Sequence, residues 1–79
     1  MTKLEKKKNT ERFKVEVLVD LLERYPVVIY PHFYKFEYNG FVYDYYPGGG
    51  RLNRISNIDY RLNVWSDCNI DEFIKIFLG

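Results

Sequence analysis

The sequence predicts an α+β domain in which helices cover one face of an antiparallel β-sheet. Three stretches lead to this prediction. An amphipathic stretch over residues 10–25 stops at Pro26. An alternating aromatic run then turns back on itself at Asn39-Gly40, and a second amphipathic stretch begins after Asn69. Because helices and sheets bury their apolar faces against one another, these stretches predict one layered domain.

The length of the chain, 79 residues, allows one small domain. Aromatic residues make up 19% of it, and large rings are what a small core needs. The formal net charge is only +1, but residues 1–15 hold six of the 12 lysines and arginines. We expect residues 1–9 to form a basic N-terminal arm, either disordered or an extension of the first helix. Residues 10–79 are expected to form the domain.

The first helix is predicted over residues 10–25. Apolar side chains recur there at helical spacing, beginning with Phe13 and Val17. Asn9 or Thr10 can cap its start, since both side chains accept hydrogen bonds from free backbone N–H groups. Pro26 ends it, because the residue before a proline avoids the helical region.

A β-hairpin is predicted over residues 33–46, with Asn39-Gly40 as a two-residue turn. Such a turn fixes the register of the two strands and places Tyr38 opposite Phe41. Six rings then share the face expected to lie under the helices: Tyr34, Phe36, Tyr38, Phe41, Tyr43 and Tyr45.

The opposite face of this hairpin carries both rings and charges. The same register places Lys35 opposite Asp44 and Phe33 opposite Tyr46. Opposite charges and aromatic pairs both stabilise cross-strand neighbours. These four side chains are therefore expected to lie on the outer face of the sheet.

The strands beyond this hairpin are less sharply marked. Residues 27–30 are β-branched but precede Pro31, which favours an edge strand or an irregular lead-in. A third strand is predicted over residues 61–65, with residues 51–55 either in that strand or in a bent preceding one. The prediction is a three-stranded antiparallel sheet.

The second helix is predicted to start after Asn69, because Glu72 completes a capping box with it. Its apolar stripe consists of Ile70, Phe73, Ile74 and Phe77. The predicted element order is thus α–β–β–β–α, with both helices on one face.

The glycine run Gly48–Gly50 is the one segment that resembles a phosphate loop. A Walker loop needs a lysine and a serine or threonine after its glycines, followed by a helix. Here a strand-like stretch follows, so we expect a turn whose glycines supply positive φ angles. An anion-binding nest aided by Arg51 and Arg54 stays open as the alternative.

Residues that could carry catalysis or bind a metal are few. His32 and Cys68 are the only residues of their types, and no metal-ligand spacing surrounds them. Asp44, Asp59 and Asp67 fall on different predicted elements. We therefore expect no enzyme activity, no cofactor and no metal site.

The composition also bears on the cellular compartment of the protein and on its association with membranes. A single cysteine and the lack of an apolar leader favour the cytoplasm. No window approaches the roughly 20 apolar residues of a membrane helix, so no membrane association is expected.

Nucleic-acid binding stays open as an alternative function. The basic residues available for it are Lys6, Lys7, Lys8, Arg51 and Arg54. The order α–β–β–β–α is also that of double-stranded-RNA-binding domains, which grip phosphates with a basic start to their second helix. In this chain Asp67, Asp71 and Glu72 surround that start and would repel phosphates.

The segment "DYYPGGGRL" resembles a motif of small phage and prophage accessory proteins. Their pattern reads aspartate, two aromatics, proline, any residue, threonine, glycine, a basic residue and an aromatic. The matching residues are Asp44, Tyr45, Tyr46, Pro47, Gly50 and Arg51. Gly49 replaces the threonine and Leu52 the final aromatic, and the similarity extends over residues 12–79.

The resemblance implies a phage-encoded protein that binds and blocks a host component and carries no catalytic residue. We therefore expect a non-enzymatic module that inhibits a host protein, such as a component of nucleic-acid-based antiviral defence of the anti-CRISPR kind. The expected binding residues are Phe33, Lys35, Asp44, Tyr46, Arg51 and Arg54. A homodimer that covers this face is the alternative use of the same surface.

Overall fold

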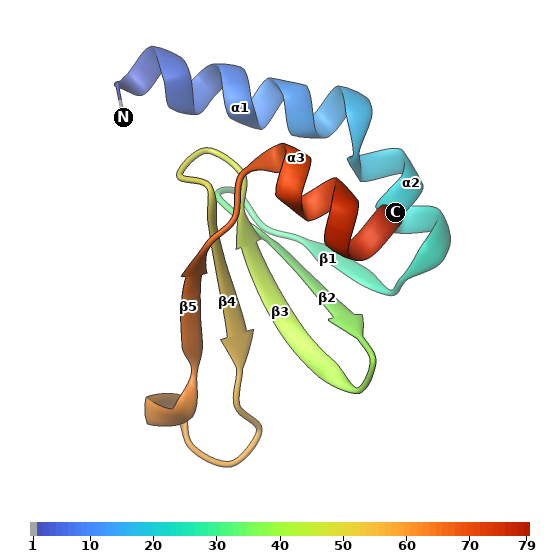
Figure 1. Cartoon of the computed structure of the whole chain (residues 1–79), viewed down its shortest axis with the longest axis vertical. Helices are drawn as coiled ribbons and strands as arrows, with labels where there is room; N and C mark the ends of the chain where they lie inside the picture. Colours follow the sequence, from blue (N-terminus) through green and yellow to red (C-terminus); the bar gives the residue numbers. More distant parts are fainter. Residues whose placement is uncertain (1) are drawn as a thin grey trace.

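A computed structural model of the chain, in which residues 2–79 are described, has all its helices on one face of a single sheet (Figure 1). The sheet has five antiparallel strands that lie side by side in chain order. Its strands are β1 (Val27–Ile29), β2 (Tyr34–Tyr38), β3 (Phe41–Tyr46), β4 (Arg51–Ile55) and β5 (Val64–Asp67). The helices are α1 (Lys3–Glu16), α2 (Leu18–Arg24) and α3 (Ile70–Phe73), which continues as a π-helical segment over Ile74–Leu78. A 3₁₀ turn, Tyr60–Leu62, precedes β5.

The predicted three-stranded sheet in the order α–β–β–β–α is wrong, because the sheet has five strands: β1 forms one edge, and residues 51–55 form a separate strand between β3 and β5. β1 pairs with β2 and ends before Pro31, so the proline costs no ladder hydrogen bond. Residues 51–55 and 64–67 are two separate antiparallel strands joined by a loop. The comparison with double-stranded-RNA-binding domains loses its basis, since it rested on the predicted element order.

The first helix begins earlier than predicted and bends within its length. The hydroxyl of Thr2 caps α1 by accepting a hydrogen bond from the Glu5 N–H at 3.2 Å. Residues 3–9 therefore extend the first helix. At Val17 the backbone departs from helical geometry (φ −120°), yet its N–H still bonds the Phe13 carbonyl at 2.9 Å. The bend separates α1 from α2 and leaves both Phe13 and Val17 fully buried.

The predicted β2–β3 hairpin is confirmed in its turn and its register. Tyr38 lies opposite Phe41 and Lys35 opposite Asp44. Asn39 and Gly40 have φ angles of 50° and 80°, as a type I′ turn requires. The turn chemistry acts locally, which is why the sequence predicts this element correctly.

The core lies between the sheet and the three helices. Phe13 of α1 stands at its centre, with its ring centroid 4.7 Å from that of Tyr34 and 5.5 Å from that of Phe73. Of the six rings predicted to face the helices, three are buried and Phe41 is about half exposed. Phe41 follows the hairpin turn, at the end of the sheet that α1 leaves uncovered (Figure 1).

The predicted capping box of the second helix is confirmed. Asn69 Oδ1 accepts a hydrogen bond from the Glu72 N–H at 2.9 Å, and Asn69 Nδ2 donates to Glu72 Oε1 at 3.0 Å. Arg12 of α1 donates to Asp71 Oδ1 at 2.7 Å, which links α1 to α3 and lowers the pKa of Asp71.

None of the described helices is both long and apolar enough to cross a bilayer.

Candidate functional site

The face of the sheet away from the helices carries a row of four aromatic rings, the outer aromatic row. Its members are Tyr30, Phe33, Tyr46 and Trp65. Successive ring centroids along it are 4.5, 5.0 and 5.5 Å apart. Side chains of a strand alternate between faces, so this row lies opposite the core. Its rings stack mainly on one another, and Trp65 at its end is about half exposed.

A polar row runs beside these rings on the same face. Lys35, Asp44 and Asn53 are direct neighbours across β2, β3 and β4. Asp44 is only 7% exposed and Asn53 only 5%. Lys35 Nζ lies 2.9 Å from Asp44 Oδ1, an ion-pair distance without the alignment of a hydrogen bond. The predicted contact between Lys35 and Asp44 is thus confirmed, while Asn53 Oδ1 has no hydrogen-bond partner among residues 2–79.

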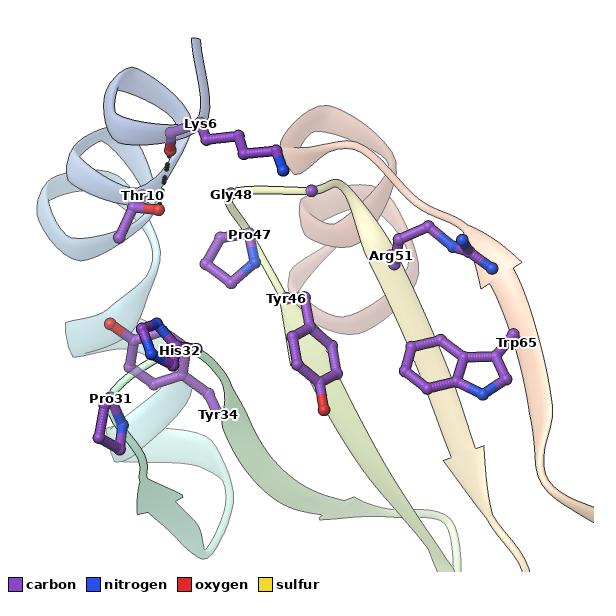
Figure 2. A pocket seen from close by; sticks show the side chains of 11 residues that line it. Lys6, Thr10, Pro31, His32, Tyr34, Tyr46, Pro47, Gly48, Arg51 and Trp65 are labelled. Atoms are coloured by element: carbon purple, nitrogen blue, oxygen red, sulfur yellow. Dashed lines mark hydrogen bonds between the residues drawn. The ribbon is translucent and has the colours of Figure 1, made fainter. Parts of the chain in front are cut away.

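A pocket of about 450 Å³ opens where α1 overhangs the end of the sheet. We call it the proximal pocket, and its lining includes Lys6, Tyr46, Gly48, Arg51 and Trp65. Figure 2 shows Lys6 reaching along the Gly48 turn from α1, with Tyr46 and Trp65 on the strands below it. The Arg51 guanidinium carbon lies 5.4 Å from the centroid of the Trp65 ring. Cationic and aromatic side chains thus line one concave site.

The turn beside this pocket, residues 47–50, packs closely against α1 and against the segment that follows β5. A side chain at Gly48 would meet Thr10 Oγ1 at 3.1 Å, because α1 packs directly onto the turn. Gly50 has a φ of 64°, in the left-handed region that favours glycine. The carbonyl of Gly50 accepts a hydrogen bond from the Cys68 N–H at 2.7 Å. The prediction of a turn with positive φ therefore holds at Gly50.

The predicted binding residues do not form one site. Phe33, Lys35, Asp44, Tyr46 and Arg51 all lie on the outer face of the sheet. Arg54 points to the other face, because three positions along a strand reverse the direction of a side chain. Its guanidinium carbon lies 4.9 Å from the centroid of the Phe41 ring.

Sequence reasoning missed Trp65, Tyr30 and Asn53. Finding them requires the pairing of β1 with β2, of β4 with β3 and of β5 with β4, and none of these pairings was predicted. The alternation in β5 was the available signal, since it places Trp65 and Asp67 on the same face as Arg51.

The opposite end of the sheet carries exposed apolar side chains, the distal apolar surface. Its members are Phe41, Ile58, Tyr60 and Leu62. Ile58 is 85% exposed, Tyr60 79% and Leu62 59%. Phe41, Ile58 and Leu62 line a shallow pocket of about 250 Å³ together with Arg54.

Polar side chains hold the loop that presents this surface. Ser56 Oγ accepts hydrogen bonds from the N–H groups of Ile58 and Asp59 at 3.2 and 3.3 Å. Asn63 Oδ1 accepts from the Ser56 N–H at 2.7 Å. Arg61 donates to both carboxylate oxygens of Asp59, which lowers the pKa of that carboxyl group. These hydrogen bonds lie within the loop itself, while its apolar side chains remain exposed.

The candidate catalytic and metal-binding residues are dispersed. Asp44, Asp59 and Asp67 each pair with a different cation, namely Lys35, Arg61 and Arg51. Cys68 is buried, and burial raises the pKa of its thiol to about 11. Within residues 2–79, no three His, Cys, Asp or Glu side chains are grouped so that they could hold a metal ion.

Comparison with protein-family models, with curated protein sequences and with solved structures finds no match to this chain. The resemblance to phage accessory proteins therefore stays a prediction, carried by the segment from Asp44 to Arg51.

Proposed function

We propose that this chain is a non-enzymatic binding module that docks on another protein through the distal apolar surface. The observation that carries the proposal is a loop, held by hydrogen bonds of Ser56 and Asn63, on which Ile58, Tyr60 and Leu62 are exposed to solvent. Single exposed apolar residues are common, but neighbouring ones on a protruding loop are typical of interaction sites.

The internal hydrogen bonds of the loop favour binding. Ordering a flexible loop on association costs free energy, and a loop that is already held by Ser56, Asp59 and Asn63 avoids part of that cost. Tyrosine and arginine are also the residue types that dominate the energetics of protein interfaces. Tyr60 and Arg54 supply one of each at this end of the sheet.

The partner that fits this surface is a folded protein with an apolar cleft and a carboxylate at its rim. Arg61 is already neutralised by Asp59. Arg54 has no carboxylate partner among the described residues, and a carboxylate at the rim of the cleft would complement it. The resemblance to phage accessory proteins supports a host protein as the partner, such as a component of antiviral defence whose action the binding would block.

The test compares two serine substitutions at equally exposed apolar positions. Ile58→Ser alters the distal apolar surface, whereas Val15→Ser alters a side chain on α1, away from that surface, that is 79% exposed. Each purified variant is used to capture proteins from a bacterial lysate, and the affinity of any captured protein is then measured with purified components. We expect Ile58→Ser to weaken binding by at least tenfold and Val15→Ser to leave it unchanged.

Two results would contradict the proposal. Equal affinity of both variants would show that the partner uses another surface. A purified chain that is dimeric, and that Ile58→Ser makes monomeric in light scattering, would show that the surface binds a second copy of this chain.

A further inference from the structure

The proximal pocket lies at the other end of the sheet from the distal apolar surface and has a different chemistry. Its volume of about 450 Å³ falls in the range of roughly 300–1,000 Å³ that is typical of small-molecule sites. Its walls come from α1, from the loop before β2, from the turn after β3 and from β5 (Figure 2). Sites built from several elements in this way can contact a ligand on more than one side.

Two cations reach this pocket. Lys6 has no carboxylate partner in the part of the chain that the structure describes, and Lys3 lies one turn earlier on the same stripe of α1. Arg51 Nε is 3.6 Å from Asp67 Oδ1. The Asp67 side chain is 97% exposed, so solvent screens this attraction and leaves the guanidinium available to another anion.

Two aromatic rings form the floor of the same pocket. The ring centroids of Tyr46 and Trp65 are 5.5 Å apart, and Trp65 is about half exposed. Exposed rings beside cations are the combination with which proteins bind nucleotides, because rings stack on bases and cations contact phosphates. Gly49, beside them, is exposed and carries no side chain that would block the approach of a ligand.

We propose that the proximal pocket binds one nucleotide unit, with Lys6 and Arg51 at its phosphate and the rings of Tyr46 and Trp65 against its base. Such a unit can come from a free nucleotide or from single-stranded nucleic acid. A base-paired duplex does not fit the proposal, since its bases are stacked on one another and cannot reach the rings. The proposal is independent of the distal apolar surface and of the protein partner.

Trp65 makes the proposal directly measurable, because it is the only tryptophan of the chain. Its fluorescence is followed during titration with four probes: adenosine monophosphate, a ten-nucleotide single strand, a duplex of the same length and inorganic phosphate. The backbone amide signals of Gly48 and Gly49 in nuclear magnetic resonance spectra give a second readout that does not depend on light absorption by the probe.

We expect quenching by the single strand, by the mononucleotide or by both, with an affinity that falls as salt concentration rises. The single strand binding at least tenfold tighter than the mononucleotide would identify nucleic acid as the source of the unit. Comparable affinities would identify the free nucleotide.

The matched variants each remove one positive charge. Lys6→Gln and Arg51→Gln are expected to weaken binding roughly tenfold each, because each removes a charge-assisted contact to phosphate. Lys75→Gln, on the C-terminal helical segment away from the pocket, is expected to change affinity less than about twofold. Circular dichroism of each variant checks that it is folded.

Three results would overturn the proposal. The first is no response to any probe at low salt. The second is a response to inorganic phosphate or to the duplex that equals the response to the single strand. The third is folded Lys6→Gln and Arg51→Gln variants that bind as well as Lys75→Gln.

Discussion

Tyr45 joins the centre of the sheet to the segment that leads into α3. Its side chain is fully buried, and its ring centroid lies 4.2 Å from that of Phe73. Its hydroxyl donates a hydrogen bond to the Cys68 carbonyl at 2.9 Å. Burial raises the pKa of the Tyr45 hydroxyl, so the group stays protonated and keeps donating this bond.

We predict that Tyr45→Phe lowers the free energy of unfolding by about 1–2 kcal/mol, because the buried Cys68 carbonyl loses its partner. Urea denaturation measures the change. Tyr60→Phe is the control, since that exposed hydroxyl has no hydrogen-bond partner among the described residues, and it should change stability by less than about 0.5 kcal/mol. Equal effects of the two substitutions would show that the buried hydrogen bond contributes nothing.

The Cys68 thiol makes stability depend on pH in the alkaline range. Burial raises its pKa from 9.0 to about 11, so the unfolded chain releases this proton at lower pH than the folded chain does. Between about pH 9 and pH 11 the unfolded state thus binds fewer protons, and the free energy of unfolding falls as pH rises.

We predict that this loss is on the order of 2 kcal/mol by pH 11 and that it is absent from Cys68→Ala. Urea denaturation of both proteins from pH 7 to 11 measures it. Groups other than Cys68 titrate in both proteins, so the difference between the two curves isolates the thiol. Parallel curves would contradict the prediction.

At the scale of elements, the turn from Pro47 to Gly50 decides how α1 meets the sheet. Its three glycines have different surroundings. Gly48 is in close contact with α1, Gly50 has a left-handed backbone, and Gly49 is open to solvent. Glycine is therefore needed at position 48 because α1 approaches closely, and at position 50 because of the left-handed backbone. At position 49 neither reason applies.

We predict that alanine substitutions separate these roles. Gly49→Ala should be neutral, because the nearest atom to the added carbon is Arg51 Cγ at 3.7 Å. Gly50→Ala should cost about 1–2 kcal/mol for its left-handed conformation. Gly48→Ala should cost about 1–3 kcal/mol, since the Thr10 hydroxyl, 3.1 Å from the added carbon, and the Lys6 carbonyl, 3.4 Å from it, have to shift. Chemical denaturation of the three variants checks the order, and a destabilised Gly49→Ala would refute it.

At the scale of the whole molecule, an aromatic cluster connects all the layers. Phe13 contacts Tyr34 and Tyr45 of the sheet and Phe73 of α3, with ring centroids 4.7, 5.4 and 5.5 Å away. A domain of this size has a total stability of roughly 4–12 kcal/mol. One ring that joins two helices to the sheet can therefore account for a large part of it.

We predict that Phe13→Ala costs about 3–5 kcal/mol and lowers the melting temperature by roughly 15 °C or more. Thermal denaturation followed by circular dichroism measures this. Phe41→Ala removes the same ring from a half-exposed position and should cost less than about 1.5 kcal/mol. Similar melting temperatures for the two variants would show that Phe13 does not hold the layers together.

The candidate site could be predicted from the sequence only in part. The hairpin register placed Lys35, Asp44 and Tyr46 correctly on one face, because that register depends on a two-residue turn. Arg51 and Arg54 were grouped although they occupy opposite faces, since the sequence left open whether residues 51–55 form a strand of their own. The distal apolar surface was not predicted at all, because exposed apolar residues resemble core residues in sequence.

By itself, the sequence determined the features whose causes are local. These are the helical periodicity that leads to α1 and α2, the Asn39-Gly40 turn with its register, and the Asn69 cap of α3. Only the tertiary structure decided that five strands form the sheet and that Trp65 joins Lys6 and Arg51 at one pocket. The reason is that edge strands and pockets depend on contacts between segments that are distant in the chain. The stability of such contacts cannot be inferred from any short stretch of sequence.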